Sequence, residues 1–251
     1  ISMGGASAAE NQYYINGYSV ANALTGLGFV SLPFDAIDQQ QIYTGGYGAE
    51  YGRSTGGVIS IVTKRGGNTW KGGVGMYVTP QYFRQQPRSI YRENGVLYQY
   101  RGDNKSSSTQ YTGYISGPLI KDKLFLYAAG DFTSTKGPTI SPFTTPQDSK
   151  ETSKATKYLA KIDWNITDSH IVELTALSDK TNTDRSIYGY NYQTLQQSSY
   201  LGTDKLKNAA SLAGSEPGGD VYIGKYTGYI TDDLTVNALY GTSKTDHVRN
   251  L

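Results

Sequence analysis

The residues that could carry chemistry gather in one glycine-rich stretch, "YGAEYGRSTGGVISIVTKRGG" (47–67). It opens like a phosphate-binding loop, in which backbone N–H groups surround a phosphate. However, "GRSTGGV" lacks the Gly-Lys-Ser/Thr ending of such a loop, and no helical pattern follows it to present an anion-binding N-terminus. We therefore predict no nucleotide site here. Glycines permit positive φ angles and close approach of the backbone, which fits tight turns between short strands.

Other catalytic or metal-binding patterns are missing. His170 and His247 have no neighbouring ligands at metal-binding spacing, and the absence of cysteine removes thiolate metal sites, disulfides and cysteine catalysis. The acidic turns lack the order of a calcium loop, and no nucleophile lies beside a base in a recognisable pattern. A net charge of +2 is too small to indicate nucleic acid. The sequence thus predicts no enzyme, no metal, no cofactor and no nucleic-acid partner.

The composition limits the class of protein. Apolar residues make up 37% of the 251 residues and the mean hydropathy is −0.49. No stretch approaches the roughly 18 apolar residues of a membrane helix. A transmembrane β-barrel still fits, because only alternate residues of each strand contact lipid. No signal peptide is recognisable at the start, and neither end reads as natural, so we expect an internal piece of a longer chain.

From Trp70 onward, apolar residues alternate with polar ones, which predicts strands. In "KYLAKIDWNI" (157–166) the even positions are apolar and should share one face, whereas Lys161, Asp163 and Asn165 face the other way. In "HIVELTALSD" (170–179) we expect Leu174 outward and Glu173 inward. In all we predict seven strands: 70–83, 110–119, 123–132, 157–166, 170–179, 220–230 and 234–243. The segment 123–132 is apolar at nearly every residue, so its two faces cannot be told apart.

The connections between these segments alternate between long and short. We expect long loops at 84–109, 133–155 and 180–219, and tight turns at 120–122, 167–169 and 231–233. Outer-membrane barrels have long external loops and short periplasmic turns, and strands of about ten residues cross the hydrocarbon layer. Seven strands do not close a bacterial barrel, so this piece should supply only one wall. A soluble antiparallel meander with a buried second face is the alternative.

Residues 1–69 differ from the rest and predict a small α+β domain. Short strands are expected at 12–20, 40–46 and 56–64, with a helical turn at 31–39. The expected fold class is therefore mainly β: a small domain (1–69), then antiparallel transmembrane strands (70–251). The glycines that should shape its turns are Gly45, Gly46, Gly52, Gly56 and Gly57.

The stretch "LPFDAIDQQQIYTGGYGAEYGRSTGGVISIVTKRGGN" resembles the end of the plug domain of TonB-dependent outer-membrane receptors. Together with "NQYYINGYSV" and "SGPLIKDKLFLYAAGDF", it looks like the Oar-like branch, over roughly residues 10–135. Two departures are Asn16–Gly17, where the family has Asp-Gly, and Gln41, where an acidic residue is often seen. The matching positions are Ile37, Ile42, Gly45–Gly46, Tyr51–Gly52, Gly56–Gly57, Val58–Val62 and Thr63–Lys64.

The resemblance implies a plugged barrel of 22 strands in the bacterial outer membrane. It would take up or export an unknown solute, peptide or protein, energised by the TonB complex through a segment outside this chain. The alternatives are a surface-interaction or adhesion protein that uses the same barrel and its loops, and a soluble lectin-like β-protein.

A removable plug should contact the wall through polar rather than apolar groups. Glu50 and Arg53 on the glycine-rich turn are our candidates, with Glu173 as the partner of Arg53 on the wall, since arginine can hold a carboxylate with two hydrogen bonds. Solvation of each charge in a wet lumen is the alternative.

Two long loops are candidate binding regions. Tyr188, Tyr190 and Tyr192 cluster in "SIYGYNYQ", where tyrosine offers rigid contact area with a polar tip, and packing between loops is the alternative. The 84–109 loop carries a net charge of +3 by our count of five basic and two acidic residues. Such a loop favours contact with outer-membrane lipid and lipopolysaccharide, which are rich in phosphate.

Overall fold

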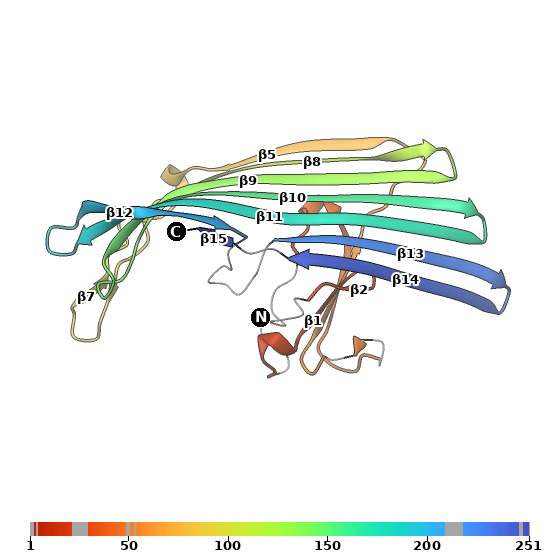
Figure 1. The fold of residues 1–251 in the computed structure, drawn as a ribbon, viewed down its shortest axis with the longest axis horizontal. Coiled ribbons are helices and arrows are strands. Elements are labelled where there is room, and N and C mark those ends of the chain that lie inside the picture. Colours follow the sequence, from red (N-terminus) through yellow and green to blue (C-terminus); the bar gives the residue numbers. More distant parts are fainter. Residues whose placement is uncertain are drawn as a thin grey trace.

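The computed structural model describes residues 3, 5–21, 30–48, 51–52, 54–208, 218–245 and 248–250. Two sheets account for most of it, a small one formed by the N-terminal residues and a large one formed by nearly all of the rest (Figure 1). Helical structure in the described residues is confined to short 3-10 turns. None of these helices is long and apolar enough to cross a membrane.

The small sheet has four strands in the order β2-β1-β4-β3. β1 and β4 are parallel, and the other two pairs are antiparallel. Tyr13 and Ile15 of β1 and their partners Ile59 and Ile61 of β4 share one face and are buried, so the sheet has a packed side. We call residues 3–69, as far as they are described, the small domain. Its elements are η1 (Ala8–Glu10), β1 (Gln12–Ile15), β2 (Tyr18–Ser19), η2 (Phe34–Ala36), β3 (Ile37–Tyr43) and β4 (Val58–Thr63). Most of the predicted helical turn at 31–39 is therefore not helical.

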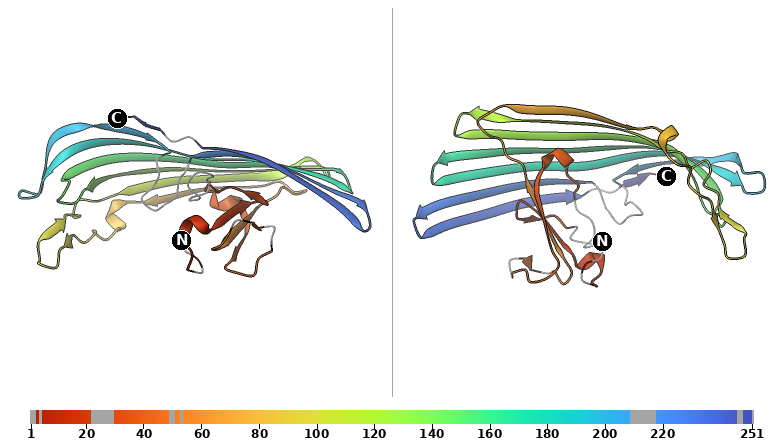
Figure 2. Two further views of the ribbon diagram at one scale, coloured as in Figure 1. Left: turned by 60° about the horizontal axis from the view of Figure 1, so that its bottom comes forward. Right: turned by 180° about the vertical axis from the view of Figure 1, so that it is seen from behind.

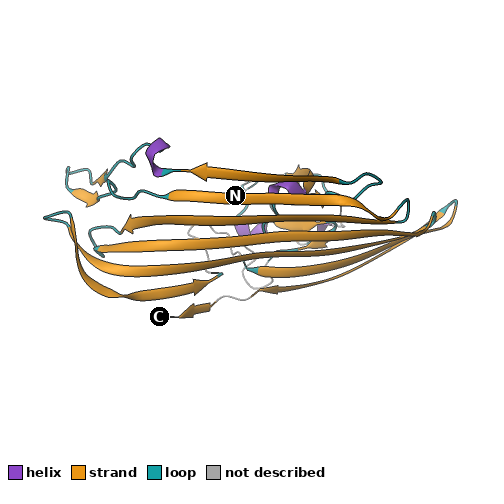
Figure 3. Ribbon diagram, turned by 90° about the horizontal axis from the view of Figure 1, so that it is seen from above, coloured by secondary structure: helices purple, strands orange, loops and turns teal. Residues whose placement is uncertain are grey.

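Seven antiparallel strands form the continuous path of the large sheet, and we call them the wall. Their order is β14-β13-β11-β10-β9-β8-β5, and they run side by side along the length of the molecule (Figures 1 and 3). The sheet is open, since β5 and β14 have no neighbouring strand on their outer edges among the described residues. The wall strands are β5 (Lys71–Thr79), β8 (Ser107–Ile120), β9 (Leu124–Ile140), β10 (Gln147–Thr167), β11 (His170–Asn191), β13 (Gly219–Thr231) and β14 (Leu234–Thr245).

The small domain lies against one face of the wall, which we call the inward face (Figure 2). The register assigns the two faces. Ile162 is paired with Leu126 on one side and Leu174 on the other, so these three side chains share the outward face. Asp163 and Glu173 are paired on the inward face. These are the faces that the alternation predicts.

The outward face carries an exposed apolar band. The band covers β5, β8, β10, β11, β13 and β14, and an exposed apolar surface of this extent indicates contact with lipid or with another protein. Its exposed members are Val74, Met76, Val78, Tyr111, Ile115, Leu119, Tyr158, Trp164, Ile166, Leu174, Tyr222, Ile230, Leu234, Val236 and Tyr240.

The long loops predicted at 133–155 and 180–219 are wrong, because most of these residues form strands. β9 and β10 continue well beyond the apolar band, so only residues 141–146 connect them, and β11 and β12 (Gln196–Lys207) fill much of 180–219. These strand ends read "TSTKGPT" and "SKETSKATK". Both of their faces can contact water, so no apolar period marks them as strands. β12 pairs with the outer half of β11, and β15 (Val248–Asn250) pairs with β12.

The third long connection lies between β5 and β8. It contains η4 (Gln81–Phe83), directly after β5, and the two-stranded ribbon of β6 (Ile90–Tyr91) and β7 (Leu97–Gln99). Figure 3 shows η4 as a short helical turn at the end of the uppermost strand.

Candidate functional site

The contact between the small domain and the wall contains a cluster of five charged residues. Arg65 follows β4 and reaches the wall, where its Nε atom donates to Asp163 Oδ1 at 3.1 Å and its Nη2 atom lies 3.8 Å from Glu173 Oε1. Lys161 Nζ lies 3.6 Å from Asp163 and 3.3 Å from Glu173. Lys225 Nζ lies 3.5 Å from Glu173 Oε2. Arg65 is the member that belongs to the small domain.

The strand register explains why the cluster forms. Asp163 and Glu173 are direct cross-strand neighbours, and Glu173 is the neighbour of Lys225 on its other side. Two carboxylates in that position repel each other unless cations lie between them. The side chains of Asp163 and Lys161 are 0% and 3% exposed, whereas Arg65 is 52% exposed. The buried part of the cluster therefore belongs to the wall, and the small domain adds a cation at its water-accessible edge.

A second polar contact is made by Asn16, at the turn between β1 and β2. Its Nδ2 atom donates to Thr63 Oγ1 at 2.9 Å and to Thr175 Oγ1 of the wall at 3.2 Å, while its Oδ1 atom accepts from the Thr63 backbone N–H at 3.0 Å. Asn16 has a φ angle of 51°, and asparagine tolerates this left-handed conformation. The Thr175 hydroxyl accepts this hydrogen bond, so the Asn16 amide joins the turn of the small domain to the wall.

Further hydrogen bonds hold other segments of the small domain to the wall. The Ser31 backbone N–H donates to Asp179 Oδ2 at 3.0 Å, and the Tyr127 hydroxyl donates to the Asp35 carbonyl. Beyond β4, Asn68 Nδ2 donates to Asp122 Oδ1 at 2.6 Å, in the turn between β8 and β9. Polar contacts are thus distributed along the interface and are not confined to one point.

Apolar groups also pack between the two parts. Val30 and Ala36 of the small domain belong to one buried cluster with Leu159, Leu177 and Val221 of the wall. The expectation of a polar rather than apolar contact is therefore wrong in part. Wall positions beneath the small domain are removed from water, and apolar side chains there are stabilised by burial.

Gly66 lets the Arg65 segment approach the wall closely. A Cβ atom at Gly66 would lie 2.5 Å from the Leu126 carbonyl oxygen and 2.9 Å from the Leu126 nitrogen, which is closer than side-chain atoms approach a backbone. Any larger residue would push the segment away from β9 and move the Arg65 guanidinium from Asp163.

The predicted plug–wall residues are placed as follows. Glu50 and Arg53 lie outside the described residues, so the proposed pairing of Arg53 with Glu173 has no structural description. Glu173 lies on the inward face, in contact with Arg65, Lys161 and Lys225. Sequence reasoning missed Arg65, although it lies only a few residues after β4. The charged inward positions Lys161 and Asp163 were the signal that a cation of the small domain would find partners there.

The glycine-rich turn is held by its own tyrosines. The Tyr47 hydroxyl donates to the carbonyls of Ser54 at 3.0 Å and Gly56 at 3.3 Å. The Gly57 N–H donates to Asn11 Oδ1 at 2.8 Å. Gly46 has a φ of 69°, which requires glycine or a similarly permissive residue. Gly45 and Gly52 belong to the same turn, and a Cβ atom at Gly45 would meet no described atom within 4 Å.

The tyrosines at the far end of β11 join neighbouring loops. Tyr190 stacks on Tyr100 with ring centroids 6.4 Å apart, and Tyr192 meets Phe143 edge to face. The Tyr192 hydroxyl donates to the Ser141 carbonyl at 2.5 Å. These residues lie beyond the apolar band. Burial, followed by the nearby charge of Asp103, raises the pKa of Tyr190 to about 12.

Tyr188, the third member of that set, contacts Tyr200 at 5.4 Å between ring centroids, and Lys150 Nζ lies 4.9 Å from its ring centre. Among the described residues, no group of three or more His, Asp or Glu side chains is arranged to hold a metal ion.

The chain has relatives of known class. It is 33% identical over 129 residues to the TonB-dependent transporter Oar of Myxococcus xanthus, a match covering 51% of this chain and 12% of that protein. It is 27% identical over 154 residues to the probable TonB-dependent siderophore receptor PirA of Acinetobacter baumannii, covering 59% of this chain and 18% of that protein. The chain thus spans less than a fifth of either relative, and no protein-family model matches it.

Solved structures share the fold. The siderophore receptor PirA from Acinetobacter baumannii matches 95% of this chain with 32% of its own, at a TM-score of 0.54 and 17% identity. A mutant of the ferric enterobactin receptor PfeA from Pseudomonas aeruginosa matches 95% of this chain with 33% of its own, at a TM-score of 0.55 and 14% identity. At these identities the matches show that the wall and small domain adopt the receptors' fold.

Proposed function

We propose that this chain belongs with the Oar-like TonB-dependent receptors of the bacterial outer membrane and forms one side of a gated transporter. In this proposal residues 70–251 are barrel wall and residues 1–69 are the end of a plug that closes the pore. The outward apolar band then faces lipid. The protein moves a solute, peptide or protein and has no catalytic role of its own.

The observation that carries the proposal is the location of Arg65. Its guanidinium bridges two wall carboxylates while remaining 52% exposed, so water can replace these contacts when the plug moves. Exposed ion pairs contribute roughly 1 kcal/mol or less each. The other polar contacts, made by Asn16, Ser31 and Asn68, are hydrogen bonds, so each contact can be broken in turn by a pulling force.

The force would come from the TonB complex, acting through a segment outside this chain. Outer-membrane lipid surrounds the wall, and lipopolysaccharide is its partner in the outer leaflet. The second candidate, a surface-interaction or adhesion protein, is favoured by the joined tyrosines of the external loops. In that case the plug would stay in place permanently.

A cysteine accessibility experiment tests the gate without knowledge of the cargo. Thr175 is 4% exposed under Asn16, and the chain has no natural cysteine. Thr175→Cys is introduced in the full-length protein, and cells are treated with fluorescein maleimide. We expect labelling in energised cells and little labelling after a protonophore or without TonB.

Lys154→Cys is the matched control, since Lys154 is exposed on an adjacent strand and should be labelled under every condition. Equal labelling of the Thr175→Cys variant with and without TonB would reject the gated transporter and favour the surface-interaction protein.

A further inference from the structure

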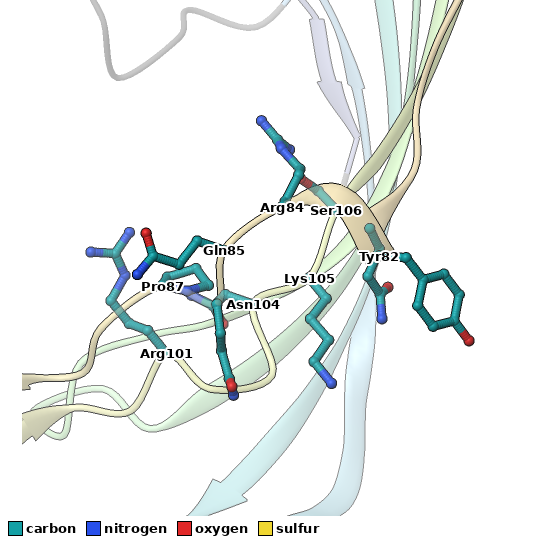
Figure 4. A pocket seen from close by; sticks show the side chains of 10 residues that line it. Tyr82, Arg84, Gln85, Pro87, Arg101, Asn104, Lys105 and Ser106 are labelled. Carbon is teal, nitrogen blue, oxygen red and sulfur yellow. The ribbon is translucent and has the colours of Figure 1, made fainter.

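A polar pocket lies at the external end of β5, away from the contact between small domain and wall. It has a volume of about 540 Å³, and its two sides are residues 81–87, which include η4, and residues 101–106 before β8. Figure 4 shows the side chains that line it. The volume lies within the usual range for small-ligand sites, roughly 300–1,000 Å³.

The charge of the lining is entirely positive. Arg84, Arg101 and Lys105 line the pocket, and no Asp or Glu does. None of the three forms an ion pair with a carboxylate within the part of the chain that the structure describes. Three cations without a carboxylate between them repel one another, so an anion bound there would be stabilised.

Neutral donors add to the positive charge. Gln85, Gln86 and Asn104 also line the pocket. Asn104 Oδ1 accepts the Ile140 N–H at 2.8 Å, so its amide nitrogen is left as a donor. Guanidinium and amide donors suit phosphate oxygens, which accept several hydrogen bonds at once.

The two sides are fixed to each other by hydrogen bonds. Arg84 Nη1 donates to Ser106 Oγ at 2.5 Å, Gln86 Nε2 donates to the Gly102 carbonyl at 2.7 Å, and the Arg101 N–H donates to Ser89 Oγ at 3.2 Å. The pocket is therefore built before any ligand arrives, which lowers the entropic cost of binding.

Two aromatic residues place this pocket beside the lipid-facing surface. β5 carries the exposed Val74, Met76 and Val78 and leads directly into η4, where Tyr82 and Phe83 are 94% and 89% exposed. Aromatic side chains at the ends of transmembrane strands mark the boundary between hydrocarbon and headgroups. The basic pocket adjoins them, at the level where phosphate groups are found.

We propose that this pocket binds a phosphate group on the headgroup of an outer-leaflet glycolipid. Arg84, Arg101 and Lys105 neutralise the phosphate, and Tyr82 and Phe83 contact the adjoining acyl-chain region. The inference rests on the proposed outer-membrane location and deepens it by naming a site and a chemical group. It does not depend on movement of the plug.

The test uses the full-length protein in detergent, titrated by native mass spectrometry. The probes are lipid A with two phosphates, the same lipid without phosphates, and inorganic pyrophosphate. We expect the phosphorylated lipid to bind about tenfold more tightly than the dephosphorylated one, and pyrophosphate to bind more weakly than the phosphorylated lipid. The triple variant Arg84→Gln, Arg101→Gln, Lys105→Gln should lose that tenfold preference.

The matched control is the triple variant Lys136→Gln, Lys154→Gln, Lys205→Gln, which removes the same charge from exposed positions outside the pocket. It should keep the tenfold preference for the phosphorylated lipid. The double variant Tyr82→Ser, Phe83→Ser should weaken the binding of lipid A and leave the binding of pyrophosphate unchanged. The proposal is overturned if both triple variants behave alike, or if free pyrophosphate binds as tightly as the phosphorylated lipid. Failure of the gate would instead appear as TonB-independent labelling of the Thr175→Cys variant, with lipid binding intact.

Discussion

The two faces of the wall both carry apolar side chains, but their surroundings differ. On the outward face, Leu174 and Val236 are 52% and 42% exposed, within an apolar band that is almost free of charge. On the inward face, Leu177 and Val221 are almost completely buried beneath the small domain, near a cluster of charged residues. The outward face is thus suited to lipid, and the inward face to a folded protein neighbour with water at its edges.

This difference explains how one sheet can serve two environments. Adjacent residues of a strand point to opposite faces, so the polarity and burial of the side chains can change completely from one residue to the next. Asp163 and Trp164 show this most sharply, since the first is a buried anion and the second is an exposed aromatic residue. The variants below test each face in turn.

The largest effect is expected at Lys161. Its side chain is 3% exposed and lies between Asp163 and Glu173, so Lys161→Met leaves a buried carboxylate without its nearest wall cation. Removing one partner of a buried pair costs about 3–5 kcal/mol. Urea unfolding of the full-length protein in lipid vesicles, followed by tryptophan fluorescence, measures the loss.

Lys154→Met is the control for that substitution, because Lys154 lies on the same strand and is exposed. It should change the free energy of unfolding by less than about 0.5 kcal/mol. A loss below about 1 kcal/mol for Lys161→Met would mean that Arg65 and Lys225 alone compensate the two carboxylates.

The next effect contrasts neighbouring residues of β14. Val236 is exposed on the outward face, and Asn237 on the inward face accepts a hydrogen bond from Thr227 at 3.0 Å. Val236→Arg should cost about 1–2 kcal/mol in vesicles, because the charge enters the lipid layer near its edge, where the cost is below that at the midplane. Asn237→Arg should cost less than half as much. Equal costs would show that the outward face of β14 is not in lipid.

The alternation of residues was enough to predict the wall but not its full length. In the apolar band, one face must be apolar, so Ile162, Trp164 and Leu174 reveal both strand and register in the sequence. Beyond the band, β10 continues through "SKETSKAT", where water is available on both faces and no pattern is required. Hydrogen bonds to β9 and β11 form those strand ends, and such pairing depends on residues distant in sequence.

The contact site was predictable only on the wall side. The inward charges of Lys161, Asp163 and Glu173 follow from strand parity. Their partner could not be identified in the same way, since Arg65 meets Asp163 across a separation of 98 residues. Any cation near the end of the small domain satisfies the charge argument. Choosing among them requires the path of the backbone, which Gly66 brings against β9.

A smaller effect is expected at Arg65, which is half exposed and therefore contributes less than Lys161. Arg65→Gln should weaken the resting contact by about 1 kcal/mol, and in the Thr175→Cys background it should raise maleimide labelling without TonB roughly fivefold. Arg65→Lys keeps the charge and should therefore raise maleimide labelling less than Arg65→Gln does. Unchanged labelling in both variants would show that the apolar contacts of Val30 and Ala36 hold the small domain without Arg65.

The smallest effect is expected at Asn16. Asn16→Gly tolerates the same φ angle but lacks the amide that donates to Thr175 Oγ1. Thr175→Val, which removes the acceptor of that hydrogen bond, should cost about 0.5 kcal/mol, the low end of the range for one hydrogen bond. Because both variants remove the same hydrogen bond, the double variant should cost less than the sum of the two. Strict additivity in urea unfolding would show that Asn16 acts only through Thr63, within the small domain, and that this turn does not help to hold the small domain against the wall.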